Sequence, residues 1–126
     1  MMITRTNFIV RVNVDYQAPY TDPIQVNAGD EVVIDLDKQT DIIGWVWCTN
    51  SNGKSGWVPK TYVEFFGKLG KMRFEYNAIE LTVRVGDILT VLKAESGFYW
   101  VANQKNLQGW VPISHVEYCE NEWEAR

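Results

Sequence analysis

One short motif occurs twice in the sequence in nearly identical form, and this repetition constrains the fold more than any other feature. Residues 56–64 read GWVPKTYVE, and residues 109–118 read GWVPISHVEY. Other landmarks recur in the same order: VDYQA and FEYNA, two Gly-Asp pairs that precede apolar runs, and the aromatic clusters GWVWC and GFYWV. Because several landmarks repeat in one order, we expect the chain to fold as two copies of one small unit.

The two copies differ in length, and the difference locates loops. Matching landmarks are 60 residues apart at Tyr16 and Tyr76 but 53 apart at Pro59 and Pro112. Deletions concentrate in loops, so loops are expected between these landmarks. The remaining runs are short, rich in β-branched and aromatic residues, and alternate between apolar and polar positions, which is typical of strands. The sequence therefore predicts an all-β chain in which each copy closes into a small barrel.

Charge and composition narrow the classes of function. The net charge is −4 and the pI is near 4.9, whereas nucleic-acid-binding proteins usually carry a basic face, so no nucleic-acid partner is expected. No apolar run is long enough for a secretory signal or a membrane span, so we expect a cytoplasmic protein without a membrane partner. Cys48 and Cys119 fit no metal-ligand spacing and are expected to be free thiols.

The order of motifs in the first copy resembles that of the Src-homology-3 (SH3) domain, and of its bacterial variants in particular. The motifs are VDYQA, DPIQVNAGDEV, GWVWC and GKSGWVPKTYVE, and the resemblance covers about residues 10–64 and again 71–118. It implies two tandem five-stranded SH3-like barrels, residues 8–65 and 70–119, joined by the short apolar linker FFGKLGK. In that family the ligand is usually a proline-rich peptide lying across exposed aromatic rings, with acidic residues that pair with a ligand Arg or Lys.

Carried onto this chain, the resemblance implies a peptide-binding groove in the first barrel. The expected peptide-binding residues are Tyr16, Tyr20, Asp22, Asp41, Trp45, Pro59 and Tyr62. Val14 stands where the family has its first groove tyrosine. Residues 8–64 hold eight acidic and four basic side chains, a charge that favours a basic peptide.

The second barrel has lost part of this groove and is expected to be mainly structural. Phe98 replaces the groove tryptophan and His115 replaces the last tyrosine, although Phe74 and Tyr76 keep the opening positions. The tryptophans outside the groove are expected to pack within or around the barrels: Trp47, Trp57, Trp100 and Trp110.

The sequence thus predicts a non-catalytic interaction module that binds proline-containing or basic extended peptides. No enzyme is expected, because the carboxylates are not paired and a Cys48–His115 pair would have to join two barrels without an oxyanion-hole motif. No metal and no cofactor are expected. Two alternatives remain open: a bacterial cell-wall or glycan-binding barrel, and a structural protein that uses its aromatic rings for oligomerisation. The oligomeric state is left open.

Overall fold

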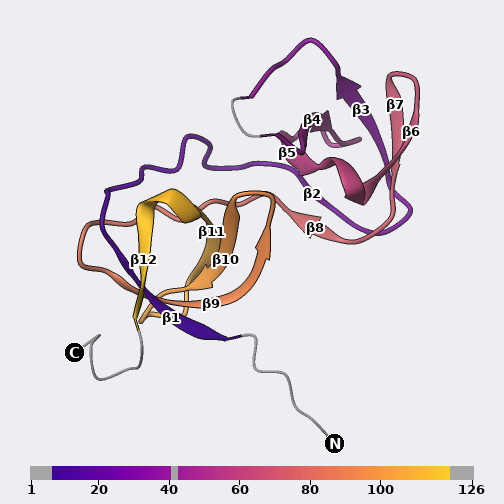
Figure 1. Cartoon of the computed structure of the whole chain (residues 1–126). Helices are drawn as coiled ribbons and strands as arrows, with labels where there is room; N and C mark the ends of the chain where they lie inside the picture. The colour runs from indigo at the N-terminus through magenta and orange to yellow at the C-terminus, as the bar shows by residue number, and fades with distance from the viewer. Residues whose placement is uncertain (1–6, 41–42, 120–126) are drawn as a thin grey trace, which may run out of the picture. The chain divides into compact units, whose positions relative to one another are not determined.

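The computed structural model describes residues 7–40 and 43–119 and confirms the all-β prediction (Figure 1). The chain forms two compact units. Residues 20–79 form one, which we call the contiguous unit; residues 1–19 and 80–126 form the other, which we call the split unit. Over the described ranges we find no helix with the length and apolarity needed to cross a bilayer.

The contiguous unit is built on a five-stranded antiparallel sheet in the order β5-β4-β3-β7-β6. Its strands are β3 (Glu31–Asp35), β4 (Trp45–Thr49), β5 (Ser55–Pro59), β6 (Val63–Phe66) and β7 (Leu69–Met72). A two-stranded sheet pairs β2 (Gln25–Val26) with β8 (Tyr76–Asn77), and the short 3-10 helix η1 (Lys60–Tyr62) joins β5 to β6. Apolar side chains alternate inward, as in β3, where Val32 and Ile34 are buried and their neighbours exposed.

The split unit repeats this architecture in the order β11-β10-β9-β1-β12. Its strands are β1 (Phe8–Val12), β9 (Ile88–Glu95), β10 (Phe98–Ala102), β11 (Gln108–Pro112) and β12 (Val116–Cys119), with the 3-10 helix η2 (Ile113–His115) before β12. Its buried core consists of Val10, Val12, Val83, Leu89, Val91, Val101 and Val111.

Each unit takes its first strand from the other sequence repeat. In Figure 1 the indigo strand β1 lies between the orange β9 and the yellow β12, and β7 of the second repeat lies between β3 and β6 of the first. Val12 is opposite Val116, and Met72 is opposite Val63. Val12 and Met72 hold matching positions in the two repeats, as do Val116 and Val63. The exchanged strands therefore keep the same register.

The compact units follow the exchange, whereas the expected domains follow the sequence repeats. We predicted domains at residues 8–65 and 70–119, but the compact units divide between residues 19 and 20 and between residues 79 and 80. Residues 65–71 are no linker, because Phe66 pairs with Leu69 and closes the hairpin β6–β7. The two-residue turn has Gly67 at its first position with a φ of 67°, as a type II′ turn requires. Such a short turn holds the two strands side by side, so the second repeat's first strand must pair with the first repeat's last strand.

Side-chain volumes in the two cores agree with the exchange. At Gly70 in β7, an added Cβ would lie 2.5 Å from Val63 Cγ1 and 3.0 Å from Ile34 Cδ1. The matching residue in β1 is Val10, which is fully buried in the split unit. Each strand therefore carries the side chain that its present unit can accommodate.

Candidate functional site

The expected peptide-binding residues that the structure describes are divided between the two compact units. Tyr16 lies in the split unit, because it follows the exchanged strand β1. Five others lie in the contiguous unit: Tyr20, Asp22, Trp45, Pro59 and Tyr62. Asp41 lies outside the described residues. The expected grouping of Tyr16 with Trp45 and Tyr62 stays a prediction, and the structure assigns Tyr16 to a different compact unit from the other two.

Tyr16 is instead part of the packing of the split unit. Its ring meets the His115 ring edge-on, with centroids 5.4 Å apart, and its hydroxyl donates a hydrogen bond to the Glu80 carboxylate. Its backbone also exchanges two 2.9 Å hydrogen bonds with Val83. Burial raises the pKa of the Glu80 carboxyl above its ordinary value, and the bond from Tyr16 opposes part of that shift.

The exchange supplies the contiguous unit with both opening aromatics of the second repeat. The ring centroid of Tyr62 is 5.2 Å from that of Phe74 and 5.6 Å from that of Tyr76, both in edge-to-face geometry. Phe74, at the position where the first repeat has Val14, is 54% exposed. The contiguous unit therefore has a residue at each of the five positions of the expected groove, a set that we call the ladder: Phe74, Tyr76, Trp45, Pro59 and Tyr62.

Only part of the ladder is accessible. Trp45 was expected to be an open platform for a ligand. Its side chain is only 7% exposed, and the next residue of β4 is buried as well. Pro59 is opposite Trp45 on β5 and is also buried. Tyr76 is buried, and its hydroxyl donates to the backbone oxygen of Trp57 at 3.0 Å. Phe74 and the half-buried Tyr62 therefore form the open part of the ladder.

A second group of rings, which we call the tryptophan cluster, joins Tyr20, which the sequence assigned to binding, with Trp47 and Trp57, which it did not. Trp47 and Trp57 are opposite each other on β4 and β5, with ring centroids 5.1 Å apart, and Tyr20 lies 5.2 Å from Trp47. The Lys38 ammonium lies 4.3 Å from the Trp47 ring centroid and 5.9 Å from that of Trp57. All three rings are half-buried. The spacing of two between Trp45 and Trp47 was the signal, because it puts both indoles on one face of β4.

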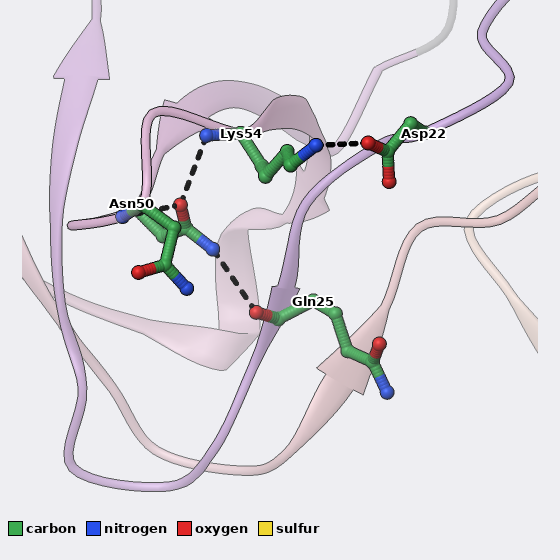
Figure 2. Close-up of polar contacts among 5 residues, drawn as sticks. Asp22, Gln25, Asn50 and Lys54 are labelled. Carbon is green, nitrogen blue, oxygen red and sulfur yellow. Dashed lines mark hydrogen bonds and ion pairs between the residues drawn. The ribbon is translucent and has the colours of Figure 1, made fainter.

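Asp22, the described acidic candidate, has a partner within the same unit. Figure 2 shows its carboxylate ion-paired with the Lys54 ammonium. Asn50 joins the Lys54 turn to the segment after Asp22, since its side-chain nitrogen donates to the Gln25 carbonyl at 3.1 Å and its side-chain oxygen accepts the Lys54 N–H at 3.0 Å (Figure 2). Both charged groups are exposed, and pairs of this kind contribute about 0–1 kcal/mol. A ligand cation could displace Lys54 at little cost.

Net charge does not distinguish the two units. Each contains eight acidic and six basic side chains, a formal charge of −2. The acidity expected for residues 8–64 is diluted in the contiguous unit because the exchanged segment brings Lys68, Lys71 and Arg73. Any preference for a basic ligand must therefore come from local carboxylates and rings rather than from the overall field.

Metal-ligating clusters and reactive thiols are two features on which enzymes often rely. Across residues 7–40 and 43–119, no three His, Cys, Asp or Glu side chains are grouped as a metal site would require. Cys48 is fully buried, and burial raises the pKa of its thiol to about 12. The thiol is therefore protonated at neutral pH and is a small apolar core residue.

Comparison with known proteins agrees with the internal repeat. Residues 9–66 and residues 71–119 each match the family model of the variant SH3 domain. No solved structure matched the chain. The two matches follow the sequence repeats rather than the compact units, because a comparison along the sequence carries no information on which strands pair.

Proposed function

The chain belongs to the variant SH3 domain family, whose members are generally non-catalytic binding modules, and on that premise we propose that its contiguous unit binds an extended, proline-containing peptide. The observation that supports this most directly is the ladder. Its open end consists of Phe74, exposed, packed edge-on against Tyr62.

The chemistry of the ladder suits such a ligand. Aromatic rings fixed by neighbouring rings offer apolar faces that lose little conformational freedom on binding. A proline-containing peptide is already extended, so it also loses little entropy. Asp22 would add a preference for a basic residue, because its ion-pair partner Lys54 is an exposed lysine that a ligand cation could replace.

The split unit is the poorer candidate for binding and serves mainly as a structural partner in this proposal. At the positions that match Phe74, Trp45 and Tyr62, the split unit has the smaller side chains Val14, Phe98 and His115. Tyr16 is engaged with Glu80 and His115 within the unit.

Titration with a proline-rich peptide that carries a flanking arginine tests the proposal, with amide and aromatic chemical shifts as the readout. We expect shifts at Phe74 and Tyr62. Phe74→Ala should weaken binding by about five-fold or more, since an aromatic anchor contributes upwards of about 1 kcal/mol. Val14→Ala is the matched control, because Val14 is 48% exposed and holds the same position in the split unit.

Two results would contradict the proposal. One is equal loss of affinity in the Phe74 and Val14 variants, which would show that the exchanged ladder is not the site. The other is a set of shifts with soluble peptidoglycan fragments and none with any peptide, which would favour a glycan ligand for the same rings.

A further inference from the structure

We propose that the outward face of the five-stranded sheet in the contiguous unit is a self-association surface, on which a second copy of this chain packs about a two-fold axis. The surface consists of an apolar row and a charged row beside it: Val33, Leu69 and Phe66, and Glu31, Lys71 and Glu64. It contains none of the ladder residues, so the inference does not depend on the function proposed above.

The apolar row runs across three neighbouring strands. Leu69 on β7 is opposite Val33 on β3 and opposite Phe66 on β6. These side chains point away from the core, because the adjacent strand residues Val32 and Gly70 are buried. Val33, Leu69 and Phe66 are 56%, 53% and 59% exposed. A single exposed apolar residue needs no explanation, whereas an adjacent group of them often marks a contact surface.

The charged row lies next to the apolar row on the same face of the sheet. Lys71, two residues along β7 from Leu69, is opposite Glu31 on β3 and opposite Glu64 on β6. Within residues 7–40 and 43–119, the Lys71 ammonium forms no ion pair. The lysine and both glutamates are exposed, so all three charges are available to another molecule.

The split unit has the same strand order but does not present this surface. Its apolar row at the matching positions consists of Thr90 and Ile9, both half-buried, and Cys119, which is buried. The residue that matches Lys71 is Arg11, and it is ion-paired with Glu117 at 3.9 Å. The exposed rows of the contiguous unit are therefore not a general consequence of this architecture.

Charge complementarity identifies the occupant as a second copy of this chain. A surface that packs on itself about a two-fold axis must be self-complementary. An axis that runs parallel to the strands, between β3 and β7, places β3 of each copy over β7 of the other. Lys71 of each copy then faces Glu31 of the other, and Leu69 faces Val33. One arrangement therefore brings opposite charges together and covers the apolar row.

The small size of the surface implies a weak dimer. Stable interfaces use roughly 20–30 residues a side, many more than these two rows provide. Association should therefore depend on concentration, and sedimentation equilibrium of the full chain between about 10 μM and about 1 mM tests it. We expect the average mass to rise above the 14.6 kDa of one chain as the concentration increases.

Leu69→Lys tests the apolar row. It should weaken self-association by at least about ten-fold, because a two-fold interface uses the position twice. Leu107→Lys is the matched control, since Leu107 has a similar exposed fraction, 57%, and lies in the split unit. A constant mass of one chain at every concentration, or an equal effect of the two variants, would overturn the inference.

A pair of charge-reversed variants tests the arrangement of the two copies. Lys71→Glu and Glu31→Lys should each lose self-association, because each puts like charges opposite one another across the axis. Mixed in equal amounts, the two variants should form a mixed dimer, since opposite charges then meet at both positions. A mixed dimer also excludes misfolding as the reason why each variant alone is monomeric. Absence of a mixed dimer, from variants with a native circular dichroism spectrum, would refute the arrangement.

Discussion

Gly70→Ala tests the strand exchange at its most tightly packed point. The new methyl group would lie 2.5 Å from Val63 Cγ1, more than 1 Å inside the normal carbon–carbon separation of about 3.5–4.0 Å. Overpacking of this kind costs about 1–3 kcal/mol of unfolding free energy. Val63→Ala removes the opposing methyl groups and, alone, should cost about 2 kcal/mol, because Val63 is fully buried.

The double variant distinguishes exchanged from unexchanged strands. In the observed sheet a Cβ added at Gly70 would meet the Val63 side chain, so Gly70→Ala and Val63→Ala together should cost at least about 1 kcal/mol less than the sum of their separate effects. In an unexchanged chain β7 would pair with β12, and Val116, which matches Val63, would face Gly70. Val116→Ala is therefore the control, and it should add to Gly70→Ala without coupling.

Urea unfolding provides the free energies, and amide hydrogen exchange on β3 reports the contiguous unit separately, since two units need not unfold together. Coupling of Gly70→Ala with Val116→Ala, and simple additivity with Val63→Ala, would refute the exchanged arrangement.

Three further predictions concern single positions. Gly67→Ala should lower stability by about 1–2 kcal/mol, measured by urea unfolding, because φ is 67° and no neighbouring atom lies within 4 Å of the new methyl, so the cost is purely backbone strain. The Cys48 thiol, with its pKa raised to about 12 by burial, should resist alkylation at neutral pH in the native protein and react once urea unfolds it; rapid native labelling would contradict its burial. Glu80→Gln should keep the hydrogen bond from Tyr16. Because burial raises the pKa of the Glu80 carboxyl above its ordinary value of 4.5, the wild type loses stability as the pH rises past 4.5 toward the raised pKa, whereas the variant does not titrate. The stability of the variant relative to the wild type should therefore increase as the pH rises from 4.5, and a pH-independent difference would contradict this.

The strands and the repeat could be predicted from local pattern alone. Alternation in residues 31–35 puts Val32 and Ile34 inside, and the structure buries both. The repeated landmarks predicted two units of one family, which the two family matches confirm. These features depend on the alternation of apolar and polar residues and on the residue types at turns. Both can be read from a short stretch of sequence.

The expected site residues stay a prediction, and the structure shows how the two units divide them. Trp45, Pro59 and Tyr62 do share a unit, but Tyr16 belongs elsewhere, and Phe74 and Tyr76 take the opening positions. The tryptophan cluster was missed because Trp47 and Trp57 fall outside the family's groove positions, and only pairing of β4 with β5 brings their rings together. A ring's partners across a sheet follow from strand pairing, which residue type does not reveal.

The sequence by itself determined that this protein is all-β, repeated, and rich in rings suited to binding. Only the tertiary structure decided which repeat completes which sheet. The first strands of the two repeats have the same register and a similar apolar pattern. The sequence of each strand alone therefore does not show which unit it joins. The choice depends on a two-residue turn that holds β7 beside β6. It also depends on the core around Val63, which has no space for a Cβ at position 70.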